Sequence, residues 1–302
     1  MAKTLMGTSS SYPGPKGKEK ELLPPWAEKI PFNPAPYEQL LHNPASGQEE
    51  LSVERTSVTV PSGTVAPDGQ ILAVKPKQNS WTLAKRRFGS FLKTRSSTDF
   101  RRAAASYVKA GGGARISAQA ARSGRAATSA IGGFFADVAR QGIAQTARER
   151  GVDVSSRNVH SVLTDFIDKL APIGSTLEQA AARQAVIATL KDVFAKFEVE
   201  EKGIEVLDQL GEPEVRIVIE CSVAHYLNER LQQMLMSRVE KGSMSEREAN
   251  RAAVDIRQYV FGLVTLDLSR IDVINTNWNQ PEGRQVVDAI YLKAYELLEV
   301  GE

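Results

Sequence analysis

The sequence predicts a mainly α protein, in which a disordered Pro/Gly/Ser-rich N-terminal region precedes an all-α helical bundle. Two observations carry this prediction. Eleven of the fourteen prolines lie in the first 81 of the 302 residues, and proline interrupts helices and strands alike. Beyond residue 81, apolar side chains recur at the three- and four-residue spacing of amphipathic helices. The front quarter of the chain is therefore expected to remain outside the packed core.

Charge divides the chain into three physically different segments. The net charge is zero over residues 1–81, +11 over 82–150 and −9 over 151–302. We accordingly expect three domains: a disordered tail with a partner-docking motif at 1–80, a basic Arg/Ala/Gly-rich helical segment at 81–151, and an acidic α-helical bundle at 152–302. The basic and acidic segments can also attract each other, within one molecule or in a dimer, so the basic residues need not contact an external polyanion.

Before residue 151, the helices are marked by apolar spacing and by glycines. A helix begins near Trp81, beside a basic cluster. Thr98 and Asp99 are suitable N-caps for a helix over residues 100–109, which Gly111–Gly113 would end. Residues 114–130 are rich in Ala, Ser and Arg, which favours a helix that buries little area and needs a partner. Upstream, the Pro-Asp-Gly sequence at 67–69 is typical of the turn of a small β-hairpin.

After residue 151, each helix carries a broad apolar stripe. One stripe precedes Pro172, and a capping-box sequence at Ser175–Glu178 opens the next helix. Pro213 suits the first turn of a long helix, and Ser245–Glu248 is a second capping box. A last helix includes residues 286–298. Short loops imply antiparallel neighbours, so these helices are expected to share one core.

The residues most often used in catalysis do not form a recognisable site. The three histidines are His42, His160 and His225, and none has a Cys or carboxylate at metal-ligand spacing. Cys221 is the only cysteine, so an intramolecular disulfide is excluded and a cytoplasmic location is expected. We interpret Cys221 and the helical histidines as structural. The sequence predicts no enzyme activity, no cofactor, no metal and no membrane-spanning helix.

The basic segment is the first candidate binding region. Its arginines could neutralise several phosphates in a salt-dependent and sequence-independent manner. Arg115 and Arg122 are seven residues apart and would share one face of a continuous helix. Against this interpretation, no base-reading motif accompanies the arginines, and the acidic segment offers them nearby partners. The candidate nucleic-acid-binding residues are Arg86, Arg87, Arg101, Arg102, Arg115, Arg122 and Arg125.

The N-terminal tail is the second candidate. Trp26 follows a stiff Pro-Pro pair in Leu23-Pro24-Pro25-Trp26, which is typical either of a linker or, as we favour, of an anchor for an apolar groove. Upstream lies a second candidate start, Met6-Gly7-Thr8-Ser9-Ser10-Ser11. If translation begins at Met6, removal of the methionine leaves a free amine on Gly7. The same residues also fit the N-myristoylation pattern.

The order of these motifs resembles the QatB family of the bacterial Qat anti-phage defence system. The resemblance rests on the residues from Met6 to Ser11, on Gly-Pro-Lys-Gly at 14–17, on Leu23–Ala27 and on Phe100–Lys109 with the Gly-rich text that follows. It covers the front half of the chain motif by motif and the helical remainder in general character only. In contrast to the family pattern, this chain carries Met1 to Leu5 upstream of the first motif.

The resemblance implies a cytoplasmic, non-enzymatic defence component. Its partners would be an ATPase, a TatD-like nuclease and QatC, a component similar to 7-cyano-7-deazaguanine synthase that is the expected direct partner. Since the chemistry of that synthase joins a carboxylated deazaguanine to an amine, Gly7 is the expected modification site, with Leu23, Pro24, Pro25 and Trp26 as the docking residues. The alternative is a nucleic-acid-binding adaptor that recruits the nuclease through its arginine-rich segment.

Overall fold

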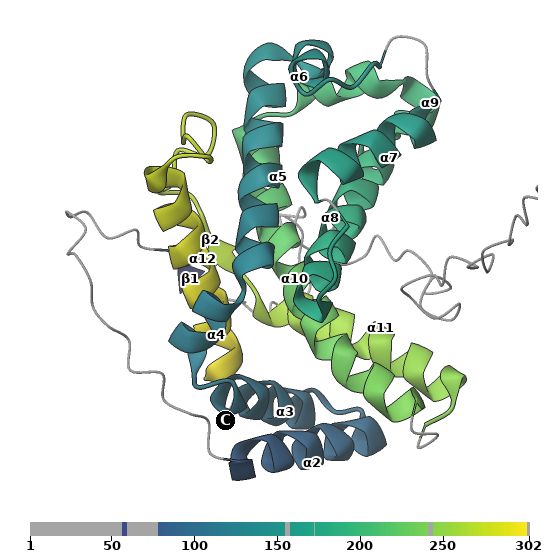
Figure 1. Cartoon of the computed structure of the whole chain (residues 1–302), viewed down its shortest axis with the longest axis vertical. Coiled ribbons are helices and arrows are strands. Elements are labelled where there is room, and N and C mark those ends of the chain that lie inside the picture. The colour runs from purple at the N-terminus through teal and green to yellow at the C-terminus, as the bar shows by residue number, and fades with distance from the viewer. Residues whose placement is uncertain (1–55, 59–77, 155–157, 172, 241–243, 301–302) are drawn as a thin grey trace, which may run out of the picture.

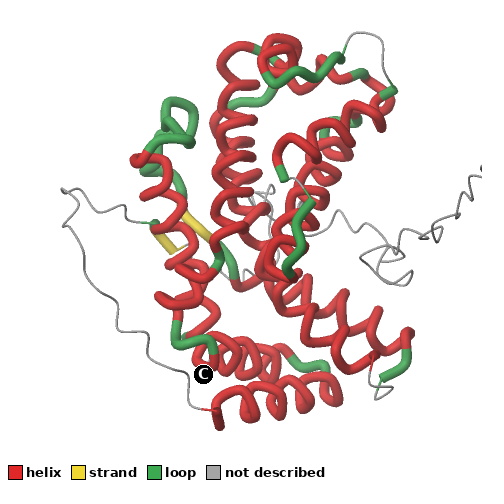
Figure 2. The backbone as a smooth tube through the Cα atoms, in the orientation of Figure 1, coloured by secondary structure: helices red, strands yellow, loops and turns green. Residues whose placement is uncertain are grey.

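A computed structural model describes residues 56–58, 78–154, 158–171, 173–240 and 244–300. Most of these residues are helical, which confirms the expected mainly α fold (Figures 1 and 2). The expected disordered tail at 1–80 lies mostly outside the described residues. The helices are α2 (Gln78–Thr94), α3 (Ser97–Ala110), α4 (Ala114–Ala120), α5 (Arg122–Gln141), α6 (Ile143–Glu149), α7 (Val159–Leu170), α8 (Leu177–Lys196), α9 (Val199–Lys202), α10 (Glu212–Glu240), α11 (Glu246–Leu263) and α12 (Pro281–Glu299), with a 3₁₀ helix, η1, at Ile204–Gln209.

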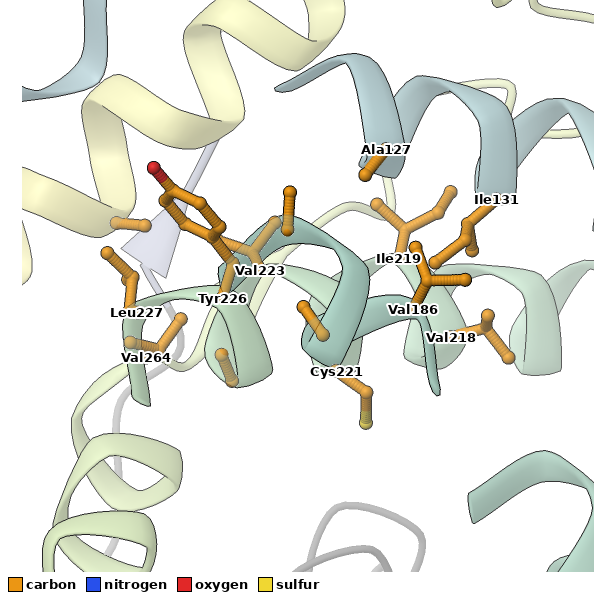
Figure 3. Packing of buried hydrophobic residues seen from close by; sticks show 14 of the residues in the cluster. Ala127, Ile131, Val186, Val218, Ile219, Cys221, Val223, Tyr226, Leu227 and Val264 are labelled. Carbon is orange, nitrogen blue, oxygen red and sulfur yellow. The ribbon is translucent and has the colours of Figure 1, made fainter. Parts of the chain in front are cut away.

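Helix α5 is the centre of the packing, because it contacts α8, α10 and α12. Its small residues allow large rings to approach its backbone. A Cβ atom at Gly124 would lie 2.6 Å from the ring of Tyr226, and one at Gly132 would lie 2.8 Å from the ring of Trp278. Figure 3 shows Ala127 and Ile131 of α5 beside residues of α8 and α10. The low apolar bulk of this segment is thus offset by aromatic side chains from its neighbours.

Helices α2 and α3 form a hairpin that packs on α11 and α12. Aromatic rings join these elements: the centroid of Phe91 lies 5.3 Å from that of Phe100, which lies 5.3 Å from that of Tyr259 on α11. The N-cap of α3 is Ser96, whose hydroxyl accepts a hydrogen bond from the backbone N–H of Asp99. The predicted caps, Thr98 and Asp99, are therefore wrong by two to three residues and lie inside the helix.

The predicted continuous helix over residues 114–130 is interrupted at Ala121, where ψ is 48°. The helix restarts as α5, and a distant carboxylate satisfies the start of this helix. Glu178 Oε1 accepts hydrogen bonds from the backbone N–H groups of Ser123, at 2.9 Å, and Gly124, at 3.2 Å. A carboxylate at a helix N-terminus is stabilising, since the first N–H groups lack partners inside the helix.

Local start signals beyond residue 151 agree closely with the structure. Ser245 and Glu248 form the predicted capping box of α11, and Pro213 lies in the first turn of α10. The box of α8 is shifted by one residue, because Thr176 is the N-cap and Gln179 its partner. These signals are right because a cap is decided by residues that lie within one turn of each other.

A two-residue parallel β pair ties the N-terminal part of the described chain to the body. Thr56 and Ser57, in β1 (Thr56–Ser57), pair with Leu266 and Asp267, in β2 (Leu266–Asp267). Val58 follows them into the core and is 2% exposed. Residues 59–77, which include the predicted β-hairpin turn, lie outside the described residues. The pair fixes the point at which the chain upstream joins the folded body.

Candidate functional site

The seven candidate arginines lie toward one end of the molecule, on α2, α3, α4 and the first turn of α5 (Figure 1). The helical hairpin α2–α3 is the most basic part, since residues 78–110 contain eight Lys or Arg residues and one acidic residue, Asp99. Two of the seven candidates, Arg87 and Arg125, are half-buried. The exposed candidates are Arg86, Arg101, Arg102, Arg115 and Arg122.

Three of the seven candidates have defined partners. Arg125 forms an ion pair with Asp288 of α12 and donates a second hydrogen bond to the carbonyl of Gln119, at 3.2 Å. Arg87 Nη1 donates to Ser106 Oγ at 3.0 Å, across the hairpin. Arg102 lies 3.6 Å from Asp99 on the same helix. These contacts indicate a mainly structural role for the half-buried arginines Arg87 and Arg125.

The other four candidates have no such partner. Among the described residues, no hydrogen bond or ion pair is formed by the side chains of Arg86, Arg101, Arg115 and Arg122. Arg125 reaches a carboxylate of residues 152–302, that of Asp288. In the part of the chain that the structure describes, the acidic bundle therefore leaves Arg86, Arg101, Arg115 and Arg122 without an ion pair.

Arg115 and Arg122 do not share one helix face as predicted. Arg115 belongs to α4 and Arg122 is the first residue of α5, with the break at Ala121 between them. Both side chains are exposed. The seven-residue spacing predicts a common face only in an uninterrupted helix, and the packing of Gly124 against Tyr226 requires the chain to turn first.

Trp81, near which the sequence predicts the start of a helix, is a surface aromatic residue. It is 37% exposed and lies edge-on against Tyr107 of α3, with ring centroids 5.8 Å apart. Lys85, one turn further along α2, is exposed on the same side. The position of Trp81 in the first turn of a basic helix was the signal in the sequence that could have indicated a surface role for this residue.

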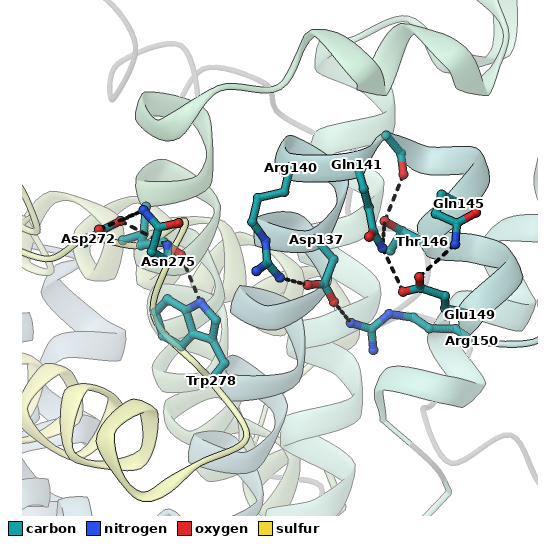
Figure 4. A network of polar contacts seen from close by, with 12 residues as sticks. Asp137, Arg140, Gln141, Gln145, Thr146, Glu149, Arg150, Asp272, Asn275 and Trp278 are labelled. Atoms are coloured by element: carbon teal, nitrogen blue, oxygen red, sulfur yellow. Dashed lines mark hydrogen bonds and ion pairs between the residues drawn. The ribbon is translucent and has the colours of Figure 1, made fainter.

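The basic residues at the opposite end of the body are engaged differently. Near the C-terminus of α5, Arg140 and Arg150 share the carboxylate of Asp137, and the second ion pair measures 2.8 Å (Figure 4). Gln141 and Gln145 both donate to the carboxylate of Glu149, each at 2.8 Å. Ion pairs and hydrogen bonds thus engage the charged side chains at this end. At the hairpin end, in contrast, Arg86 and Arg101 are exposed to solvent.

The residues with the greatest chemical reactivity lie in the interior. His225 Nε2 is 2.7 Å from Asp192 Oδ2, and the Arg257 guanidinium approaches the same carboxylate at 3.4 Å. Burial lowers the pKa of His225, so the ring is neutral near pH 7 and donates to Asp192. Burial and the nearby carboxylates raise the pKa of the Cys221 thiol. The sequence predicts structural roles for His225 and Cys221, whereas the pairing of His225 with Asp192, thirty-three residues away, has no local signal.

The described residues contain no group of His, Cys, Asp and Glu side chains arranged to hold a metal ion. None of the described helices has the length and apolarity needed to cross a membrane. Comparison with protein families gives one match: the family QatB, described as Qat anti-phage system associated protein QatB, over residues 112–298. The chain belongs to the QatB family. No curated protein and no solved structure matches the chain.

Membership in the QatB family makes this chain a component associated with the Qat anti-phage system. The matched region begins at Gly112 and spans α4 to α12, so it covers the helical body. Most of the motifs that carry the resemblance lie before it, and only the Gly-rich sequence that follows Lys109 extends into it; the α2–α3 hairpin is outside it. The match therefore confirms the family through a largely different part of the chain.

The tail candidates of this QatB-family chain are not placed by the structure. Gly7, Leu23, Pro24, Pro25 and Trp26 all lie outside the described residues. Their assignment as a modification site and as a docking motif stays a prediction from the sequence. The described chain begins at Thr56, thirty residues after Trp26.

Proposed function

We propose that this QatB-family chain is a non-enzymatic component of a defence complex, which presents its N-terminal tail to the synthase-like partner QatC. One observation in the helical body supports the proposal that the chain is not an enzyme. Cys221 and His225, which are the usual kinds of nucleophile and general base, are 0% and 1% exposed and are used for packing and for a hydrogen bond to Asp192. The description of the family likewise names an association with the system and no reaction.

The tail is the part of the chain best suited to partner contact. Leu23-Pro24-Pro25-Trp26 offers a large apolar side chain on a stiff backbone, which loses little entropy on docking. The twenty-nine residues between Trp26 and Thr56 have a contour length of at most about 100 Å. A tether of this length allows the motif to reach a separate protein while β1 holds the chain to the body.

Gly7 is the proposed substrate of that partner. If the chain starts at Met6, removal of the methionine leaves the Gly7 amine, which the partner would join to the carboxyl group of a deazaguanine. A nucleoside triphosphate would first convert that carboxyl group to an acyl adenylate with release of pyrophosphate. The Gly7 amine would then attack the acyl carbon, form the amide bond, lose a proton and displace the nucleoside monophosphate. Docking through Trp26 would place the terminus near the partner, nineteen residues away along the chain. The ATPase and the TatD-like nuclease are the further partners proposed for the complex, and the cytoplasm its location.

The docking step is tested by co-purification of the partner with the full chain. Trp26→Ala is expected to reduce recovery of QatC at least tenfold, because a buried aromatic anchor contributes about 2 kcal/mol or more. Tyr37→Ala is the matched control, since it removes an aromatic residue that also follows a proline in the same tail. Equal recovery with both variants would overturn the docking role of Trp26.

The modification step is tested separately by intact mass and N-terminal peptide analysis of protein co-expressed with the partner. A mass increase confined to a peptide that begins at Gly7 supports the proposal. An unmodified terminus in cells that resist phage would refute it, even if docking through Trp26 is retained. The two steps can therefore fail independently.

A further inference from the structure

We propose that the α2–α3 hairpin, together with the exposed side chains of Arg115 on α4 and Arg122 on α5, binds the phosphate backbone of a nucleic acid. This proposal does not depend on the tail. The proposed surface lies largely outside residues 112–298, the region that establishes the family. The charge of the hairpin is its first support. Residues 78–110 have a net charge of +7, from eight basic residues and one acidic residue.

The single acidic residue of the hairpin is already engaged. Asp99 Oδ2 accepts a hydrogen bond from Thr94 Oγ1 at 2.6 Å, and its other oxygen lies 3.6 Å from Arg102. Asp99 therefore closes the turn between the two helices and offsets the charge of Arg102 only partly, since a surface pair is weak. Arg86 and Arg101 are exposed and form no ion pair with a described residue, so their positive charges are directed at solvent.

The packing of the hairpin explains why its cations face outward. Ala103, Ala104 and Ala105 are buried, as are Phe100 and Val108, and α3 packs against α2, α11 and α12. Arg101, Arg102 and Lys109 are exposed on the same helix. On α3, Arg102 and Lys109 are two turns apart and lie about 10 Å from each other along the helix axis. Arg86 and Lys93 have the same spacing on α2.

Neutralisation by the protein itself does not account for this surface. Two arginines of the basic segment reach carboxylates of residues 152–302 across the fold: Arg95 contacts Asp255 at 2.8 Å, and Arg125 contacts Asp288. Both are half-buried and join helices. Arg86 and Arg101, in contrast, are exposed and form no ion pair with any described residue. A polyanion outside the molecule is the ligand class that complements such side chains.

Trp81 adds a feature that favours single-stranded nucleic acid. Its ring is 37% exposed at the start of α2 and is supported edge-on by Tyr107. An exposed aromatic ring beside lysine and arginine side chains can stack on a base while the cations contact the backbone. The exposed Lys85 lies one turn from Trp81. An acidic protein surface would match the charge but would not use the ring in this way.

The test is fluorescence anisotropy of labelled single-stranded and duplex DNA with the full chain at 50, 100 and 200 mM salt. The combined variant Arg86→Gln, Arg101→Gln and Arg102→Gln is expected to weaken binding to single-stranded DNA by roughly 100-fold at 100 mM salt. The slope of log affinity against log salt should fall by about two units, because each single-strand phosphate contact contributes about 0.7.

The matched control removes the same charge elsewhere. Arg148→Gln, Arg270→Gln and Arg284→Gln also replace three exposed arginines, none of which lies on the hairpin. This control should retain affinity within about threefold. Thermal unfolding of both combined variants verifies that each is folded. If the two variants lose affinity equally, or if the wild type binds neither DNA at 50 mM salt, the proposal is overturned.

Two further arms separate this proposal from its alternatives. Trp81→Ala should weaken single-strand binding about tenfold, with recovery in Trp81→Phe, because stacking needs only an aromatic face. Deletion of residues 1–30 should leave DNA binding unchanged. The hairpin proposal can therefore hold even if the proposed function of the tail is wrong. If light scattering instead shows a dimer that the hairpin variant dissociates, and DNA is not bound, the hairpin binds a second copy and the proposal is wrong.

Discussion

His225 Nε2 lies 2.7 Å from Asp192 Oδ2 in the interior of the helical body, where the two side chains are 1% and 3% exposed. The pair joins α10 to α8, and Arg257 brings α11 to the same carboxylate. Buried polar groups are costly unless each has a partner. The three residues are therefore expected to contribute to stability as a unit.

Asp192→Asn should destabilise the protein by about 3 kcal/mol, because it leaves the Arg257 guanidinium without its counter-charge in a poorly solvated site. Urea unfolding followed by circular dichroism measures the change. Asp168→Asn is the control, since Asp168 also pairs with an arginine, Arg183, but is 56% exposed. That substitution should cost less than about 1 kcal/mol. Equal losses would show that the buried pair has no special role.

Replacement by alanine should lower the stability of the protein at a buried glycine of α5 and raise it at an exposed helical glycine. Gly132→Ala is expected to destabilise by about 1 to 3 kcal/mol, since its Cβ would lie 2.8 Å from the Trp278 ring. Gly262→Ala on α11 meets nothing within 4 Å and should stabilise by about 0.5 to 1 kcal/mol. Thermal unfolding compares the two. Stabilisation by both variants would contradict the tight contact between α5 and Trp278.

Glu229 should make stability depend on pH. Burial raises its pKa from 4.5 to about 7, although Arg257 and Asn228 act in the other direction. The folded state therefore binds a proton more tightly than the unfolded state, and stability from this group falls as pH rises from about 4.5 to 7. At pH 8 the carboxylate is charged at this half-buried position.

A substitution that removes the charge of Glu229 tests this pH dependence. Glu229→Gln should stabilise the protein by about 1 to 3 kcal/mol at pH 8 and have little effect at pH 5, as measured by urea unfolding at both values. Glu201→Gln, at an exposed site on α9, should change stability by less than about 0.5 kcal/mol at either pH. A gain that is the same at both pH values would contradict the raised pKa of Glu229.

Cys221 should react with thiol reagents only when the body opens. It is the only cysteine and is 0% exposed, and both burial and the nearby carboxylates Asp192 and Glu220 raise the pKa of the thiol. Ellman's reagent should therefore report close to no thiol in the native protein and one in 6 M guanidinium chloride. Full reaction of the native protein within minutes would show that this part of α10 is accessible.

Much of the fold and part of the functional assignment could be predicted from the sequence, because the deciding interactions are local. Ser245 and Glu248 are three residues apart, and Pro213 acts on its own turn, so both mark helix starts without any knowledge of the fold. The order of the N-terminal motifs likewise indicated the family that the match over 112–298 confirms. The three charge segments are also a property of composition alone.

Only the tertiary structure decided where the Ala-rich segment breaks and which arginines stay free of carboxylates. Glu178 satisfies the start of α5 from more than fifty residues away, and Tyr226 requires the close approach at Gly124. In the same way, Arg125 meets Asp288 across the fold whereas Arg86 meets no described carboxylate. The physical reason is that helix propensity and capping depend on neighbours within a turn, while packing and charge pairing depend on residues that are brought together only when the helices assemble.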